Sequence, residues 1–265
     1  MTTTRLVSSR ACRRAFAGTW LTHTALPIPS LGLKMSHRAF AACVRFRLGM
    51  PLYSFNSALP IECPECHKNV LDRWGHHSVI CKFSNDRNSR HNQVRDVVHN
   101  FAVQGGLSCQ KEVKHLLAHH QDGAIGQKPA DILIHDYKHG KALCADITVV
   151  SPLQQQHMHQ EVRQRGQHAV ALSDAEEKKF GKYEDKCREA GLLFTPLAFE
   201  VFGGHGNHCR QLLSRLADAC AIRNNYPRSI TKCRLRQLIS IAIQRGNATA
   251  LLRRDPREYA LPGAY

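Results

Sequence analysis

The stretch that decides the expected fold is residues 129–150, PADILIHDYKHGKALCADITVV. Two runs of β-branched and aliphatic residues, 132–134 and 147–150, have the composition of strands. The polar, glycine-containing segment between them is typical of a turn. The stretch therefore predicts a β-hairpin whose turn centres on residues 138–139.

This hairpin would bring two acidic side chains together. Counting back from the predicted turn places residue 134 opposite residue 143 and Asp131 opposite Asp146, so that both carboxylates face the same side. Like charges directly opposed, with Cβ atoms about 5 Å apart, destabilise a sheet. A hard cation such as Mg²⁺ would remove that repulsion, because it binds through one or two carboxylates and keeps positions for water and phosphate oxygens. Asp131 and Asp146 are thus candidate Mg²⁺ ligands.

The composition favours a polyanionic partner. The 265 residues include 37 Lys and Arg against 21 Asp and Glu, which gives a formal charge of +16. Nucleic acid is the commonest partner of so basic a chain, and a basic organellar or ribosome-associated protein is the alternative. No stretch approaches the roughly 18 uninterrupted apolar residues of a membrane span, so we expect no membrane partner. A hydrophobic share of 43% is enough for a core.

The first residues are free of acid up to Glu62, and arginines alternate there with Ser and Thr. This composition is that of a mitochondrial transit peptide. We find no secretory signal, so most of the 11 cysteines are expected to be reduced thiols or metal ligands rather than a disulfide framework.

Outside the hairpin, helical and strand patterns alternate. Ser36 can cap a short helix that ends at Gly49, and apolar residues at helical spacing predict a second helix over about 85–104. Further expected elements are a strand near 109–113, a long helical stretch over about 154–190, a strand at 192–201 and two later helices. This order predicts an α+β or α/β core.

A compact group of cysteines and histidines precedes the second helix. Cys63 and Cys66 can hold two corners of a tetrahedral Zn²⁺ site, and His77 and Cys81 supply the other two. His76 is an alternative to His77, since both lie at a suitable spacing from Cys81. Four protein ligands leave no open position for a substrate, so this zinc site would be structural.

Basic residues follow the cluster on the expected helix. Arg87, Arg90, His91 and Arg95 occur there, and the first three are neighbours through i,i+3 and i,i+4 spacing. They are candidate contacts to nucleic-acid phosphates. A solvated helix face is the alternative.

Two further features are candidate parts of the acidic site. Residues 173–176, SDAE, form a capping-box pattern that would begin a helix carrying Lys179 and Lys182. A lysine directed at the two aspartates would stabilise developing charge on a phosphate. Glu112, on the strand expected ahead of the hairpin, is a candidate third carboxylate or an ordinary strand-end acid.

Several short motifs resemble one known family. CPEC, GHHSVIC, RHN, KPADI, ADITVVSP, KFGKY and PLAFEVFG follow one another as in the C-terminal region of site-specific non-LTR retrotransposon proteins. The resemblance implies a CCHC zinc knuckle at 61–82 and a restriction-endonuclease-like domain of the PD-(D/E)XK superfamily at 83–265, in which helices flank a mixed central sheet. Residues 1–60 would be a helical or linker segment like the one that follows a reverse transcriptase domain.

The resemblance also implies roles for individual residues. The first and second acids of the family fall on Asp131 and Asp146, and its displaced lysine falls on Lys179, with Lys182 in the same KxxKY motif. Two departures are visible: Ala130 separates Pro129 from Asp131, and Thr148 stands where the superfamily usually has a lysine.

The sequence thus supports two hypotheses. The first is a Mg²⁺-dependent DNA endonuclease of retrotransposon origin, with structural Zn²⁺ and a nuclear location, mitochondrial being the alternative. The second is a zinc-containing nucleic-acid-binding protein of the same origin without catalytic activity. DNA is the expected partner in both, with RNA of the parent element as a further possibility.

Overall fold

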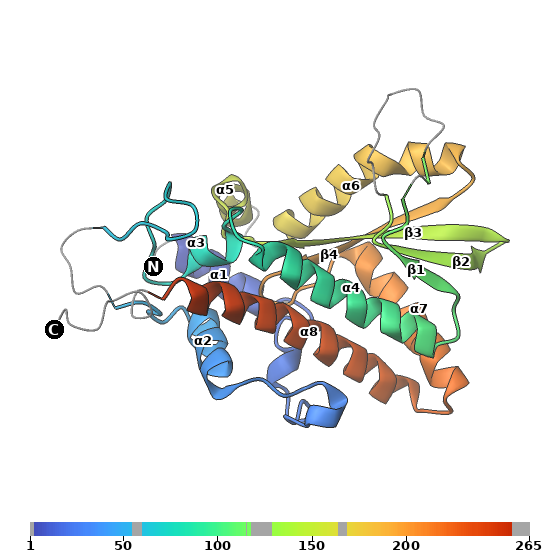
Figure 1. Cartoon of the computed structure of the whole chain (residues 1–265), viewed down its shortest axis with the longest axis horizontal. Helices are drawn as coiled ribbons and strands as arrows, with labels where there is room; N and C mark the ends of the chain where they lie inside the picture. The colour runs from blue at the N-terminus through green and yellow to red at the C-terminus, as the bar shows by residue number, and fades with distance from the viewer. Residues whose placement is uncertain (1–2, 55–59, 115, 118–128, 164–168, 256–265) are drawn as a thin grey trace.

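A four-stranded mixed sheet forms the centre of the computed structural model, which describes residues 3–54, 60–114, 116–117, 129–163 and 169–255 (Figure 1). The strand order is β1 (Cys109–Lys111), β2 (Ile132–Lys138), β3 (Lys141–Val150) and β4 (Leu193–Glu200). β1, β2 and β3 pair antiparallel, whereas β3 and β4 are parallel. The expected mixed α/β architecture is confirmed at this level.

The hairpin has the predicted register although its turn lies elsewhere. Ile134 pairs with Leu143 as expected, but the turn is at residues 139–140, where both φ angles are positive, and Lys138 pairs with Lys141. The predicted turn centre was therefore wrong by one residue. A β-bulge between residues 134 and 138 compensates, because three residues of β2 there face a single residue of β3.

The two faces of the sheet are covered by different helices, which makes three layers (Figure 1). On one face, side chains such as Ile132 and Ile147 pack against α4 (Asp86–Gln104), α7 (Asn207–Arg223) and α8 (Arg228–Arg253). The other face packs against α6 (Val170–Glu189). Because side chains alternate along a strand, Asp131 and Asp146 belong to the face that α6 covers.

Between β3 and β4 the chain forms α5 (Gln155–Arg163) and α6 (Val170–Glu189). The long helical stretch expected there is thus two helices, and residues 164–168 lie outside the described residues. The predicted capping box was wrong: Ser173 lies inside α6, and its hydroxyl donates to Glu177 at 3.1 Å. The helix begins earlier because Val170 and Leu172 are buried against the rest of the protein.

The N-terminal residues pack onto this core. They form α1 (Thr3–Cys12), two short 3-10 helices (Thr19–Leu21 and Pro29–Leu31) and α2 (His37–Leu48). The predicted caps of α2 are confirmed, since the hydroxyl of Ser36 accepts from the backbone of residue 39 and Gly49 is left-handed with φ 63°. Val7 and Phe46 join a buried cluster with Phe202, which follows β4.

The last described helix, α8, runs along α4 and also contacts α2 and α3 (His76–Ile80). None of the helices within the described ranges combines the length and apolar character that crossing a bilayer requires.

Candidate functional site

Asp146 is buried in the middle of β3 and faces a lysine of α6. The side chain of Lys179 places Nζ 2.5 Å from Asp146 Oδ2, and Asp146 is only 4% exposed. Burial raises the pKa of Asp146 to about 6; Lys179 opposes this rise, and the charge of Asp131 adds to it. The buried Tyr183, one turn beyond Lys179, anchors α6 on the sheet. Asp146 is therefore a partly desolvated carboxylate with one cation at its side.

Asp131 lies just before β2, at the place where the ladder between β2 and β3 stops. Continuation of the register from Ile132 and Ala145 sets Asp131 opposite Asp146, as predicted. Since no residue of β2 pairs with Ile147, Asp131 takes that place: its Oδ2 accepts from the Ile147 backbone N–H at 2.6 Å. The side chain thus closes the open edge of β3.

His91 of α4 completes this arrangement. Its Nε2 is 2.9 Å from Asp131 Oδ2 and 3.1 Å from the Ile147 carbonyl oxygen. Burial acts to lower the pKa of His91, but the hydrogen bond and charge of Asp131 outweigh it and raise the pKa above its ordinary value. Sequence reasoning assigned His91 to phosphate contacts and missed this position. The signal was present, because His91 precedes Val94 and Val98 on the stripe that packs on the sheet.

Glu112 lies beside Asp131 through its backbone. The Glu112 N–H donates to the Asp131 carbonyl oxygen at 3.0 Å, while the Glu112 carboxylate forms an ion pair with Arg95. Arg95 also donates to Asp96 and to Asn92, and its side chain is 10% exposed. Glu112, predicted for the acidic site, and Arg95, predicted for phosphate contact, therefore pair with each other.

Arg90 does not lie on the exposed helix face where it was expected. It is 2% exposed and donates to Asn247 Oδ1 at 2.8 Å and to the Val79 carbonyl oxygen at 3.1 Å. The reason is the close approach of α8 to α4: a Cβ at Gly246 would lie 2.4 Å from the Cβ of Arg90. Arg90 thus holds two helices together.

Arg87 keeps an accessible position. With Lys82, His91 and Thr148 it lines a cleft of about 350 Å³, of which the edge of β3 at residues 147–149 forms one side. This cleft connects the neighbourhood of Asp131 with the residue that follows Cys81. Two cationic side chains beside the open edge of the strand can accept an anionic ligand there.

Lys182, the second candidate lysine, lies elsewhere. Its Nζ is above the Tyr183 ring, 4.7 Å from the centroid, and its side chain is exposed. Of the two lysines in the KFGKY stretch, Lys179 is the one that forms an ion pair with Asp146.

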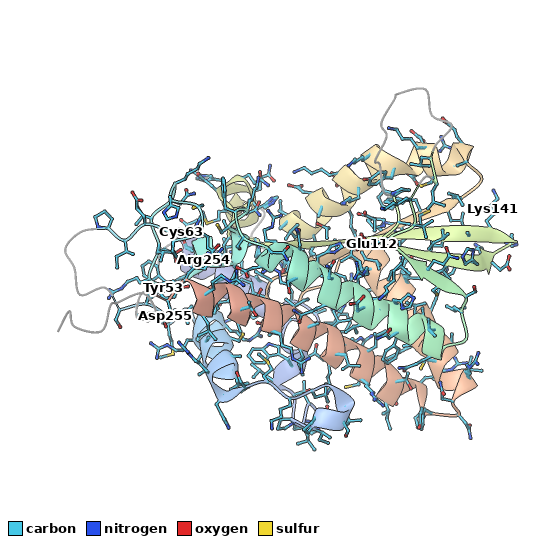
Figure 2. All side chains as sticks on the ribbon, in the orientation of Figure 1. Tyr53, Cys63, Glu112, Lys141, Arg254 and Asp255 are labelled. Carbon is cyan, nitrogen blue, oxygen red and sulfur yellow. The ribbon has the colours of Figure 1, made fainter. Side chains whose placement is uncertain are left out.

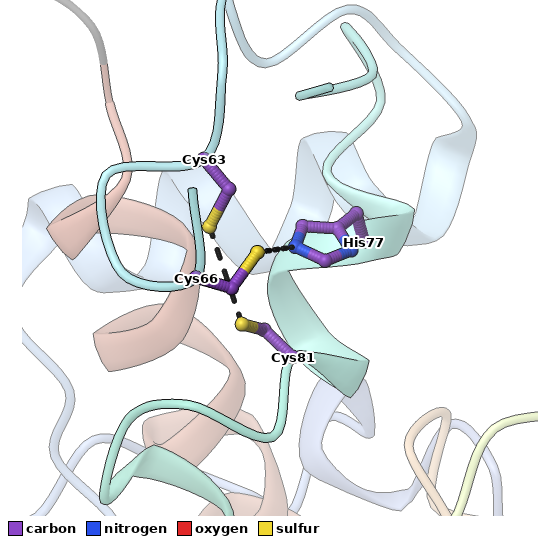
Figure 3. Close-up of side chains that lie close together, drawn as sticks. All are labelled: Cys63, Cys66, His77 and Cys81. Atoms are coloured by element: carbon purple, nitrogen blue, oxygen red, sulfur yellow. Dashed lines mark hydrogen bonds between the residues drawn. The ribbon is translucent and has the colours of Figure 1, made fainter. Parts of the chain in front are cut away.

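The cysteine–histidine cluster comes together as predicted (Figure 3). Cys63 Sγ is 4.0 Å from Cys81 Sγ, and Cys66 Sγ is 3.5 Å from His77 Nε2. In a tetrahedral site with Zn–S bonds of about 2.3 Å, two sulfurs lie about 3.8 Å apart, so these side chains can hold a metal ion such as zinc. Within the described residues, this is the one group in which three or more such ligand atoms lie within 4.8 Å of one another.

The structure also separates the two histidines. His77 faces the cysteines, whereas His76 stacks on Trp74 and lies 3.6 Å from Asp72. Asp72 accepts the backbone N–H groups of both histidines at 2.9 and 2.7 Å and so fixes the start of α3. The sequence left His76 and His77 as alternative ligands, and the structure places His77 in the cluster.

Behind the cluster lies a buried ion pair. Arg254, whose side chain is fully buried, donates to Asp86 Oδ2 and to Ser84 Oγ, both at 2.7 Å. Burial acts to lower the pKa of Arg254, but Asp86 and the neighbouring Cys81 and Cys63 outweigh it and raise the pKa. The end of α8, the start of α4 and the cluster are therefore joined at one guanidinium group.

The acidic site is built by residues far apart in the chain: His91 of α4, Asp131 before β2, Asp146 of β3 and Lys179 of α6. No model of a known protein family matches this chain, and no curated protein matches it either. The chemistry of the site is thus what points to a function.

Proposed function

We propose that this protein is a metal-dependent DNA endonuclease that hydrolyses a phosphodiester bond at the site of Asp131 and Asp146. The observation that carries the proposal is the contact of Lys179 Nζ with the buried carboxylate of Asp146, which lies opposite Asp131 in the hairpin. Acid pairs with an adjacent cation suit hydrolysis of a phosphodiester, where charge develops on the phosphate oxygens.

The two carboxylates fit Mg²⁺ by their chemistry, because this ion binds to one or two carboxylates and completes its coordination with water and substrate phosphate. Bound there, Mg²⁺ would supply Lewis acidity and a water of lowered pKa. Lys179 would stabilise negative charge on the reacting phosphate. His91 would orient Asp131 through the hydrogen bond to Oδ2.

Substrate binding would fall to the basic surface around the site. Arg87 and Lys82 would contact phosphates in the cleft beside β3. The cluster of Cys63, Cys66, His77 and Cys81 would hold structural Zn²⁺ and support the cleft from the side of α3.

We further propose that the protein is of retrotransposon origin, as its resemblance to site-specific non-LTR retrotransposon proteins implies. A restriction-endonuclease-like fold is supported by the mixed sheet between helices and by a lysine that reaches the second acid from a following helix. Residues 61–82 would then be the zinc knuckle and 83–265 the nuclease domain, and the protein would act on nuclear DNA. Thr148, which lines the cleft, stands where the superfamily usually places its lysine.

A nicking assay tests the proposal. The full-length protein is incubated with supercoiled plasmid and Mg²⁺, beside Asp131→Asn and Asp146→Asn variants and beside Asp185→Asn, an exposed acid of α6 paired with Arg188. We expect both site variants to lose at least about 100-fold in nicking rate and Asp185→Asn to retain it. Equal cutting by the parent and Asp146→Asn, or none by the parent with any divalent metal, contradicts the proposal.

A second candidate function is nucleic-acid binding without turnover. The observation in its favour is that Asp131 accepts a hydrogen bond from His91 and Asp146 forms an ion pair with Lys179, so that both acids are stabilised within the protein without a metal ion. Salt-dependent DNA binding that survives Asp131→Asn together with Asp146→Asn, with no nicking by the parent, supports this function over the first.

A further inference from the structure

The hairpin that carries the acidic site ends in two lysines that face each other. Lys138 and Lys141 are paired across the strands beside the turn at His139 and Gly140. Like charges directly opposed in a sheet are unfavourable. Among the described residues, neither lysine forms an ion pair with a carboxylate. The tip of the hairpin thus holds an uncompensated pair of positive charges, and Lys141 lies at its projecting end (Figure 2).

A groove of about 340 Å³ begins at these two lysines. Arg215 of α7 and Arg188 of α6 also line it, and Glu184 is the one acidic side chain in its lining. Arg188 is paired with Asp185 at 2.6 Å, which leaves Lys138, Lys141 and Arg215 as the cations that determine the charge of the groove.

The groove is partly fixed in shape before any ligand binds. Arg215 Nη1 donates to the hydroxyl of Tyr137 at 3.0 Å, which holds the guanidinium group against β2. The ring of Phe194 in the lining packs edge-on against that of Phe180 and obliquely against that of Tyr183. Cations along a groove are the feature that follows the phosphate backbone of nucleic acid.

We propose that Lys138, Lys141 and Arg215 form a second nucleic-acid contact, which binds phosphates of the DNA at a distance from the acidic site. Along β3, Lys141 precedes Asp146 by five residues, a separation of about 17 Å at 3.3 Å per residue. At about 3.4 Å per nucleotide along one strand, this corresponds to roughly five phosphates. The choice of DNA as the ligand rests on the proposed function. The three cations and their position around one groove are observed independently of that function.

Salt-dependent DNA binding tests the inference separately from cleavage. Two proteins are titrated with a labelled 30-base-pair duplex over a series of salt concentrations. One carries Asp146→Asn, and the other carries Lys138→Gln and Lys141→Gln in addition. We expect the added pair to weaken binding and to reduce the slope of log K against log salt by about 1.8, because each phosphate contact contributes about 0.9. Lys34→Gln plus Arg234→Gln, which removes two exposed cations from other parts of the chain, should leave the slope unchanged.

Thermal melting supplies a second readout. Lys138→Glu should melt at a higher temperature than the parent, because it places opposite charges across the hairpin, and should nevertheless bind DNA more weakly. An unchanged salt slope in the lysine double variant, or an equal reduction in the control pair, overturns the inference. The inference is also overturned if poly-aspartate displaces the labelled duplex as well as unlabelled duplex DNA does at equal charge. That result would assign the groove to acidic proteins. If the parent protein does not nick DNA but the salt slopes still differ between the variants, the proposed function fails and the inference about the groove stands.

Discussion

Lys179 Nζ on α6 lies 2.5 Å from Oδ2 of Asp146 on β3, and Asp146 is 4% exposed. The side chain of Lys179 is 28% exposed, so its ammonium group contacts the buried carboxylate and is also accessible to solvent. The helix that supplies the lysine is held on the sheet by the buried ring of Tyr183, which lies in one cluster with Leu133 and Cys144 of the hairpin. Activity at Asp146 consequently depends on the packing of α6.

Replacing Lys179 by alanine should therefore reduce nicking by about 100-fold or more, because one cation that stabilises developing phosphate charge is lost. Lys182→Ala is the matched control, since it removes an exposed lysine of the same helix that lies over Tyr183. Rates of plasmid nicking in Mg²⁺ provide the measurement. A larger loss in Lys182→Ala than in Lys179→Ala would show that Lys182, and not Lys179, supplies the catalytic cation.

Removal of metal from the cysteine–histidine cluster should destabilise the protein. The purified chain should contain about one equivalent of zinc by elemental analysis, and Cys81→Ser should lose it, because serine is a poor ligand for this ion. We expect the melting temperature to fall by at least about 5 °C in Cys81→Ser, since structural zinc contributes directly to folding. Cys109→Ser, a cysteine of β1 outside the cluster, should keep both metal and stability. Full zinc content in Cys81→Ser would exclude the assigned ligand set.

Breaking the buried pair of Arg254 and Asp86 should be costly. Arg254→Met leaves Asp86, 4% exposed, without its main partner, and removal of one member of such a pair costs about 3–5 kcal/mol. Arg253→Met removes the more exposed cation on the same acid: Arg253 Nε lies 3.3 Å from Asp86 Oδ1 and the side chain is 45% exposed, so we expect less than about 1 kcal/mol. Urea unfolding measures both. Adding Asp86→Leu to Arg254→Met should recover most of the loss, and a failure to recover would locate the effect outside this pair.

His205 should make the protein sensitive to acid. Burial lowers its pKa to about 3, with Arg236 and Arg210 adding to the effect, against an ordinary value of 6.5. Between these two values the unfolded chain binds a proton that the folded chain does not, so the contribution of His205 to stability falls as the pH is lowered from 6.5 toward 3.

The check is the pH dependence of the melting temperature in the parent and in His205→Gln, which cannot titrate. The parent should lose stability relative to the variant as the pH falls from 7 to 5, whatever their difference at pH 7. Parallel curves would show that His205 takes up a proton in the folded state, contrary to its position between the rings of Phe16 and Phe199.

The sequence by itself determined the features that depend on neighbouring residues. Counting back from the predicted turn placed Asp131 opposite Asp146, and this register holds because the β-bulge in β2 offsets the one-residue error in the turn. The caps of α2 followed from Ser36 and Gly49, because local hydrogen bonding and backbone preference fix such elements. The spacing of Cys63, Cys66, His77 and Cys81 likewise carried enough information to identify the cluster.

Only the tertiary structure decided which cations serve the acids. Lys179 rather than Lys182 reaches Asp146, and Arg90 is buried against α8, although local spacing made these residues look equivalent to their neighbours. The side that each presents depends on which helix packs against which face of the sheet. Those contacts join residues tens of positions apart, and a local pattern carries no record of them.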